Sequence, residues 1–182
     1  MAKRISAPIT DAAAACLRAG DEVLLSGKVY TARDAAHKRM DELLDSGGSL
    51  PFDVEGAVIF YVGPSPAKPG RIIGSAGPTT SGRMDKYTPR LLSLGLRGMI
   101  GKGSRSAEVK DAIVRHRAVY FAALGGAGAL ASKSIKAVRP VAYEELGTEA
   151  LTELTVEDFP LIVVNDIYGG DAYEQGRKLY SL

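Results

Sequence analysis

The sequence predicts an α/β fold in which a layered, mixed sheet is covered by flanking helices. Residues 57–62 and 118–124 form continuous apolar runs rich in β-branched and aromatic side chains, which is typical of strands buried on both faces. Residues 32–44 instead carry apolar side chains at spacings of three and four, which is typical of an amphipathic helix. Because such strands and helices alternate along the chain, we expect helices packed against a sheet.

The first part of the chain predicts two helices and three strands. In order, these are a helix over 12–18, a strand over 21–30, a helix over 32–44, and strands over 57–62 and 71–76. Thr10 or Asp11 can cap the first helix, which Gly20 ends. Gly27 interrupts the first strand and predicts a bulge or a hairpin turn there.

The rest of the chain continues the alternation. In order, it predicts a helix over 87–94, a strand over 97–100, a helix over 108–116, a strand over 118–124, a small-residue helix from the glycines at 125–128 to about 134, and strands over 137–143 and 159–166. The residues after 166 are interpreted as a polar tail. Several early strands lie close together in the sequence, which favours mixed pairing in the sheet.

Length and composition set bounds on function. The 182 residues suit one domain over 1–182, and a net charge of +2 with acids and bases mixed gives no electrostatic case for nucleic acid. Cys16 is the only cysteine, which excludes an internal disulfide and a metal site built from several thiolates of this chain. Without a signal-peptide pattern or an apolar run of bilayer length, we expect a soluble, cytoplasmic protein.

Three consecutive hydroxyl residues stand where the predicted strand over 71–76 gives way to a helix. They are Thr79, Thr80 and Ser81, and Arg83 follows shortly after. A helix N-terminus stabilises anions, and a guanidinium can bind a carboxylate or phosphate through two parallel hydrogen bonds. The corner is therefore a candidate anion site. The alternative interpretation is that one hydroxyl simply caps the helix.

Two further cations are candidates for the same site. Arg33 lies at the start of a predicted helix, where a cation is unfavourable unless a nearby negative charge compensates it. That charge could come from Asp34 or from a bound carboxylate. Lys102 lies between two glycines at a strand's end and is either a ligand-binding lysine or an ordinary solvated one. His37 is either a catalytic base or a hydrogen-bonded structural residue.

Other motifs carry less chemistry. Residues 126–131 match the G-x-G-x-x-A dinucleotide fingerprint, but they lie late in the chain, and a tight strand-to-helix turn explains the glycines equally well. Residues 101–104 fail the spacing of a phosphate-binding P-loop. The chain has no G-x-S-x-G elbow and no paired-histidine or C-x-x-C metal motif. From the residues alone, we expect a polyanion pocket that contains Arg33, Arg83 and Lys102.

Three segments taken together resemble a known family. Residues 31–39 (TARDAAHKR), 77–85 (GPTTSGRMD) and 98–103 (GMIGKG) are similar to motifs in the β subunit of class I, iron–sulfur fumarate hydratases. That subunit corresponds to the C-terminal domain of single-chain forms. The match continues in order through residues 125–131 and 156–160. The β subunit of L(+)-tartrate dehydratase shares most of the pattern but typically lacks the glycine found here at position 82, so the resemblance favours fumarase.

The resemblance implies a fold, a reaction and a partner. The fold would be a swivelling β/β/α domain that closes over a catalytic α subunit or N-terminal domain, whose three cysteines hold a 4Fe–4S cluster. The reaction would be the reversible addition of water to fumarate to give (S)-malate. The assembly would be a hetero-oligomer with two copies of each subunit.

The resemblance also implies roles for individual residues. Arg33, Arg83 and Lys102 would bind substrate carboxylates together with Thr80, and Thr79 would be the catalytic residue that moves a proton next to a carboxylate. Physical chemistry supports the cations more directly, because a dicarboxylate needs several charge-assisted contacts, whereas a threonine hydroxyl is a poor base. The alternatives are a tartrate dehydratase β subunit, a non-enzymatic module that binds small dicarboxylates or phosphates, and a nucleotide-dependent oxidoreductase.

Overall fold

The computed structural model describes residues 1–123 and 128–180 and shows a mixed α/β fold. The strands are β1 (Lys3–Ala7), β2 (Glu22–Thr31), β3 (Val58–Phe60), β4 (Gly98–Gly101), β5 (Val119–Ala122), β6 (Ile135–Ala142) and β7 (Leu151–Asn165). The α-helices are α1 (Asp11–Ala15), α2 (Asp34–Asp45), α3 (Thr88–Ser93), α4 (Ala107–Arg115), α5 (Gly128–Ser134) and α6 (Ala172–Tyr180). Two 3₁₀ helices, η1 (Ser81–Met84) and η2 (Glu144–Glu149), complete the order.

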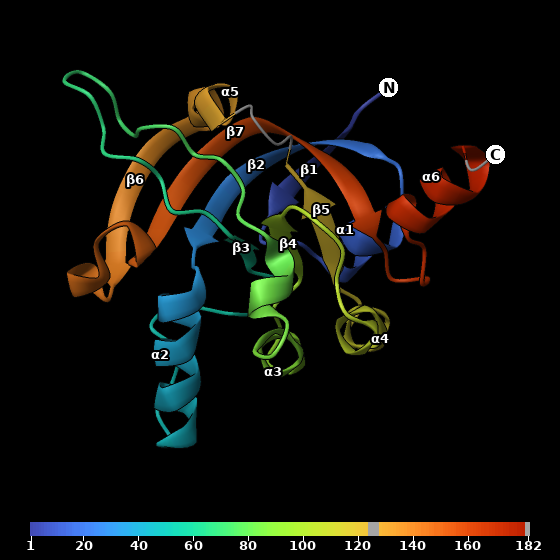
Figure 1. Ribbon diagram of the computed structural model, residues 1–182, viewed down its shortest axis with the longest axis horizontal. Coiled ribbons are helices and arrows are strands. Elements are labelled where there is room, and N and C mark those ends of the chain that lie inside the picture. The colour runs from blue at the N-terminus through green and yellow to red at the C-terminus, as the bar shows by residue number, and fades with distance from the viewer. Residues whose placement is uncertain (124–127, 181–182) are drawn as a thin grey trace.

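The strands form a mixed sheet in the order β1-β2-β3-β4-β5-β7-β6. Strands β1 to β5 pair in parallel with their neighbours, whereas β7 pairs antiparallel with β5, β6 and β2. Because β7 reaches both β5 and β2, the strands β2, β3, β4, β5 and β7 close into a ring (Figure 1). The α/β class and the mixed sheet expected from the sequence are confirmed.

Hydrophobic cores cover both faces of the parallel strands. Along β3 and the next residue, Val58 and Phe60 belong to the core shared with β7, while Ile59 and Tyr61 belong to the core under α2, α3 and α4. These helices lie together on one side of the strands (Figure 1). The prediction of a strand buried on both faces is confirmed, and each such side chain contributes roughly 1.5–3 kcal/mol by its burial.

Of the two alternatives predicted at Gly27, a bulge or a hairpin turn, the bulge is the one found. Strand β2 continues through this residue, and its register against β7 shifts between Leu25 and Gly27. Gly27 has a φ of +116°, and a β carbon there would clash with the carbonyl oxygen of Ala7 on β1. A glycine is therefore required by both the backbone conformation and the close approach of the neighbouring strand.

The strand expected over residues 71–76 is wrong. These residues are the return limb of a loop, in which the Ser65 amide donates to the Ser75 carbonyl at 3.0 Å and the Ser75 amide donates to the Ser65 hydroxyl at 2.8 Å. Strand β3, which precedes this segment, already pairs with β2 and β4 on its two sides, so the segment cannot pair beside it. Its short apolar run lies outside the sheet.

Several other boundaries differ from the expectations. Thr10 caps α1 by accepting from the Ala13 amide at 3.2 Å, as predicted, but the helix ends at Ala15. Strand β1 and helix α6 were not predicted, and β7 begins eight residues before the expected strand over 159–166. In the described part of the chain, no helix is long and apolar enough to cross a membrane.

Candidate functional site

The carboxyl ends of β2, β3 and β4 bring the predicted site segments to one edge of the sheet. Arg33 follows β2, the loop that carries Thr79 follows β3, and Lys102 follows β4 directly. Ligands of parallel α/β sheets commonly bind outside this edge, because the loops that leave adjacent strands converge there. The topology therefore places three segments from distant parts of the sequence beside one another.

Backbone hydrogen bonds join Thr79, Thr80 and Lys102. The Thr79 amide donates to the Tyr61 carbonyl at 2.7 Å, and its carbonyl accepts from the Lys102 amide at 3.2 Å. The Ser81 amide in turn donates to the Lys102 carbonyl at 2.9 Å, so Thr80 and Lys102 form an isolated parallel bridge. The segment therefore acts as an added strand-like contact between the ends of β3 and β4.

Gly101 permits this close approach. A β carbon at this position would collide with the hydroxyl oxygen of Ser81. The buried Ser81 hydroxyl lies 2.9 Å from the Tyr120 hydroxyl, which donates to the Gly103 carbonyl at 2.8 Å. Burial raises the pKa of Tyr120, so its hydroxyl stays protonated and can donate. The hydroxyl of Tyr120 thus fastens the loops on either side of Lys102.

Arg33 is enclosed between two loops at the N-terminus of α2. Its Nη2 lies 3.4 Å from Oε1 of Glu149, and a β carbon at Gly63 would lie 2.6 Å from its Nη1. Gly63 follows Val62, which bridges to Pro78, the residue before Thr79. The guanidinium of Arg33 therefore lies beside the same turn that carries Thr79, with 22% of its side chain exposed.

Arg83 reaches the site from η1 and pairs with Asp34. Its Nε donates to Oδ1 of Asp34 at 2.9 Å, and 54% of its side chain is exposed. The expectation that Asp34 answers Arg33 is therefore corrected: Glu149 pairs with Arg33, and Asp34 pairs with Arg83. Glu149, which is 116 residues away from Arg33 in the sequence, carried no signal that sequence reasoning could have used.

The interpretation of the hydroxyl corner as a helix cap is wrong. Thr80 is the N-cap residue of η1, but its side chain makes no capping hydrogen bond. Thr80 and Lys102 are exposed and Thr79 is half-buried. The Thr79 hydroxyl and the Lys102 ammonium have no hydrogen-bond or ion-pair partner among the described residues. The site is thus an open, cationic surface with free polar groups.

His37 has a structural role. It is fully buried, and its Nδ1–H donates to the Arg33 carbonyl at 2.8 Å. Burial lowers the pKa of His37 to about 4, with the positive charge of Arg105 contributing, so the ring is neutral near pH 7. Its ring packs against those of Tyr61 and Tyr87. His37 therefore supports the backbone of Arg33 and does not reach the open surface.

A buried ion pair beneath the site was not predicted from the sequence. Arg105, whose side chain is fully buried, donates from Nε to Oδ1 of Asp85 at 2.7 Å and from Nη2 to the Thr88 hydroxyl at 2.8 Å. The other oxygen of Asp85 accepts from the Ser106 amide at 2.7 Å. This ion pair joins the loop after Lys102 to the end of η1. The segments that carry Lys102 and Arg83 are therefore held together by one buried contact.

The described residues provide no metal centre. Within 1–123 and 128–180, no group of three or more histidine, cysteine, aspartate or glutamate side chains is placed to hold a metal ion. Cys16 is an exposed free thiol at the end of α1. The residues present here therefore do not fit a cluster that needs several thiolate ligands.

The dinucleotide fingerprint lies partly outside the described residues, because these exclude 124–127. Of the part that is described, Gly128 packs closely on the loop before the site. A β carbon at Gly128 would lie 2.5 Å from the Ser75 hydroxyl and 2.9 Å from the Gly77 amide nitrogen. The Ala76 amide donates to the Gly128 carbonyl at 3.0 Å. Close packing accounts for this glycine.

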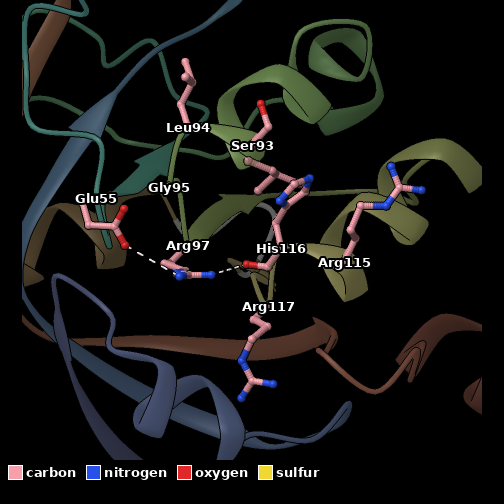
Figure 2. Close-up of a pocket in the computed structure, with 9 residues that line it drawn as sticks. Glu55, Ser93, Leu94, Gly95, Arg97, Arg115, His116 and Arg117 are labelled. Carbon is pink, nitrogen blue, oxygen red and sulfur yellow. Dashed lines mark hydrogen bonds and ion pairs between the residues drawn. The ribbon is translucent and has the colours of Figure 1, made fainter.

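A basic cavity of about 370 Å³ lies at the opposite edge of the sheet, near the residues that precede β4 and β5. Figure 2 shows Arg97 of this cavity between Glu55 and the carbonyl oxygen of His116. Arg97 also pairs with Asp11 at 3.1 Å, in addition to Glu55 at 3.6 Å. The positive charge of Arg97 is therefore already paired with two carboxylates. This cavity is not the site predicted from the sequence.

Comparisons with known proteins match nearly all of this sequence to one family. The family model described as the fumarase C-terminus matches residues 2–176. The chain is 43% identical over 153 residues to the anaerobic class I fumarate hydratase of Escherichia coli, covering 83% of this chain and 28% of that protein. It is 41% identical over 158 residues to fumarate hydratase 2 of Leishmania major, covering 86% of this chain and 28% of that protein.

A shorter relative matches over most of both lengths. A Methanocaldococcus jannaschii protein, provisionally named the β subunit of L(+)-tartrate dehydratase, is 40% identical over 171 residues, covering 90% of this chain and 88% of that protein. By contrast, the chain spans less than a third of the length of the fumarate hydratases named above. The family model covers nearly all residues of the chain, and the relatives named above include class I fumarate hydratases and a protein provisionally named a tartrate dehydratase β subunit. The chain therefore belongs to the fumarase C-terminus family.

Proposed function

We propose that this chain is the β subunit of a heteromeric hydro-lyase that interconverts fumarate and (S)-malate. One observation carries the proposal: Arg33, Arg83 and Lys102 come from three separate segments and converge at one edge of the sheet, around a threonine with a free hydroxyl. The family relationship supports the reaction type. The chain matches only about a quarter of the length of the fumarate hydratases, which supports a site completed by another chain or domain.

The cations suit a dicarboxylate and its reaction. Two carboxylates need at least two charge-assisted partners, and an arginine can bind each one through parallel hydrogen bonds. In the dehydration direction, the C–H bond next to a carboxylate breaks, its electron pair forms the double bond, and the hydroxyl group leaves. Negative charge then grows on that carboxylate, and cations that are already in place stabilise it without rearrangement.

Thr79 would move the proton in this reaction. Its backbone is fixed on both sides, by Tyr61 and Lys102, while its hydroxyl is bound by no described residue. The neighbouring cations favour a negatively charged oxygen at this position, which is what a threonine needs to act as a base. Thr80, exposed beside it, would donate a hydrogen bond to a substrate carboxylate.

The partner would be an α subunit that carries the 4Fe–4S cluster. The described residues here offer no ligand set for a cluster, and the site is open on the side of Lys102, Thr80 and Arg83. The opposing acid would also come from that partner. We infer an assembly with two copies of each subunit, in the cytoplasm.

Reconstitution tests this function. The purified chain and its α subunit, prepared anaerobically, are assayed separately and together for loss of fumarate absorbance and for malate formation. We expect turnover only from the mixture. Strong activity from the isolated chain, or none from a mixture in which both subunits form a complex, would overturn the proposal.

A tartrate dehydratase β subunit is the second candidate. The Methanocaldococcus jannaschii relative named for that activity matches this chain over 88% of its own length. Assaying the same complex with L(+)-tartrate, malate and methyl-substituted fumarates decides between the two, by comparison of kcat/KM. Tight binding of malate or phosphate to the isolated chain, measured by calorimetry, would instead favour a binding module without catalysis.

A further inference from the structure

The tip of the β6–β7 hairpin contacts the candidate site, although nothing in the family motifs points to it. Glu149, the last residue of η2, uses both carboxylate oxygens at the N-terminus of α2. Its Oε1 lies 3.4 Å from Nη2 of Arg33, and its Oε2 accepts from the Ala35 amide at 3.0 Å. We propose that Glu149 is a positioning residue that orients Arg33 toward the substrate. This inference rests on the proposed function.

The first argument is the way in which α2 begins. Arg33 is the N-cap residue of this helix, and its own side chain makes no capping hydrogen bond. Glu149 supplies the missing acceptor from a distant part of the chain, and its negative charge suits a helix N-terminus. One carboxylate therefore caps the helix and holds the arginine that starts it.

The second argument is that Glu149 is itself held in place. The Thr31 hydroxyl, at the end of β2, donates to the Ala150 carbonyl at 3.2 Å and accepts from the Thr152 amide at 3.2 Å. Thr31 is 2% exposed, and it precedes Arg33 by two residues. The same buried residue thus joins the backbone just after Glu149 to the backbone just before Arg33, which holds the two residues near each other.

The third argument is the restricted room around Arg33. Gly63 lies against its guanidinium on one side, and the Thr148 carbonyl oxygen lies near Gly63, at 3.3 Å from the position of a β carbon there. Glu149 contacts Nη2 of the same guanidinium, so the loop at Gly63 and the hairpin tip both restrict the orientation of the Arg33 side chain. Positioning matters in such a site, because a displacement of about 1 Å from the productive geometry costs up to roughly a hundredfold in rate.

Glu149→Gln separates positioning from capping. Glutamine has nearly the same shape, and its amide oxygen can still accept from the Ala35 amide, but its uncharged amide cannot form the ion pair with Arg33. We expect the melting temperature to stay close to that of the wild type. We expect kcat/KM for malate in the reconstituted complex to fall by about tenfold, mainly through KM, because the freed guanidinium must be ordered by the substrate.

Glu145→Gln is the matched control. Glu145 lies on the same hairpin tip and pairs with Arg39 of the same helix at 2.8 Å, but this pair is exposed and includes none of the proposed site residues. We expect its kcat/KM to remain within about twofold of the wild type, as is usual for exposed ion pairs. A merely structural hairpin contact would instead give similar small effects in both variants.

A double-mutant cycle tests whether Glu149 acts through Arg33. The affinity of succinate, a dicarboxylate that cannot react, is measured by calorimetry for the wild-type complex, Glu149→Gln, Arg33→Ala and the double variant. We expect Glu149→Gln to weaken binding in the wild-type background and to have no further effect once Arg33 is gone. Equal effects in both backgrounds would overturn the inference, as would tighter binding, which would mean that Glu149 competes with the substrate. A wild-type complex without activity would overturn the proposed function instead.

Discussion

Arg83 and Asp34 are joined through a single nitrogen: Nε of Arg83 donates to Oδ1 of Asp34 at 2.9 Å. The two terminal nitrogens of Arg83 have no hydrogen-bond partner among the described residues. A bond at Nε fixes the plane of the guanidinium and leaves the Nη edge open. Because that edge matches a carboxylate through two parallel hydrogen bonds, Asp34 holds Arg83 in a form that is ready to bind one.

Arg83→Lys is therefore expected to fail as a conservative change. A lysine has one ammonium group and cannot pair with Asp34 and bind a carboxylate in two places at once. We expect kcat/KM of the reconstituted enzyme to fall by about 100-fold, a loss of transition-state binding of the size that a charge-assisted pair can supply. Steady-state kinetics with malate measure the change. Arg90→Lys, on the exposed face of α3, serves as the control, and wild-type kinetics in Arg83→Lys would remove Arg83 from the site.

Gly63→Ala should displace Arg33 without removing its charge. The added methyl group would lie 2.6 Å from Nη1, so the guanidinium would have to leave its position beside Glu149 to make room. Because the guanidinium is the end of a side chain, the backbone of the fold need not move. We expect a fall of about tenfold in kcat/KM with nearly unchanged thermal stability.

Gly176→Ala is the matched control for this change. Gly176 lies in α6, and a β carbon there meets nothing within 4 Å. Equal kinetics for the two glycine variants would show that the position of Arg33 beside Gly63 does not matter for catalysis. Equal kinetics together with normal substrate affinity would also weaken the role proposed for Arg33.

The parts of the site that could be predicted from the sequence are those whose position depends only on residues close by in the chain. The buried strands β3, β4 and β5 are short apolar runs, and Lys102 follows one of them at once, so their placement depends on neighbouring residues alone. The contact of Arg33 with Glu149 depends instead on how β7 pairs with β2. That pairing joins residues more than 100 positions apart, which no local pattern encodes.

The wrong strand predictions, for the start of β7 and for residues 71–76, also arise from contacts that local pattern does not encode. The first half of β7 intersperses buried apolar residues with Thr152, Glu153 and Thr155, so it lacks a continuous apolar run, although it pairs with both β6 and β2. The segment 71–76 contains two isoleucines and was predicted to be a strand, but the preceding strand β3 is already paired on both sides and the segment forms one limb of a loop. In both cases, whether the segment forms a strand depends on its pairing with strands that are distant in the sequence.

Arg105→Met is expected to destabilise the fold strongly. The variant leaves the carboxylate of Asp85, which is 15% exposed, without its cation, and it removes a hydrogen bond to Thr88. Removing one partner of a buried ion pair typically costs about 3–5 kcal/mol. Urea denaturation of the isolated chain measures the free energy of unfolding.

Arg90→Met provides the comparison for this prediction. Arg90 pairs with Asp41 and Asp45 on a more exposed surface, so its loss should change the free energy of unfolding little. If the two variants unfold at the same urea concentration, the pair between Arg105 and Asp85 is not a stabilising anchor beneath the site.

His37 should make stability depend on pH below neutrality. In the unfolded chain its pKa is near 6.5, whereas burial lowers it to about 4 in the folded protein. Between these values the unfolded state binds one more proton than the folded state, so the free energy of unfolding falls as the pH falls. The expected slope from this residue is about 1.4 kcal/mol per pH unit, or roughly 3 kcal/mol over the whole window.

His37→Gln measures that contribution directly. The glutamine amide can still donate to the Arg33 carbonyl, but it does not titrate, so its stability should lose the part of the slope that lies between pH 6.5 and about 4. Urea titrations of both proteins at several pH values give the difference between the two curves. The carboxylates that also titrate in this range cancel in that difference. Parallel curves across the window would mean that His37 takes up its proton at the same pH in the folded and unfolded proteins, so that burial does not keep its ring neutral.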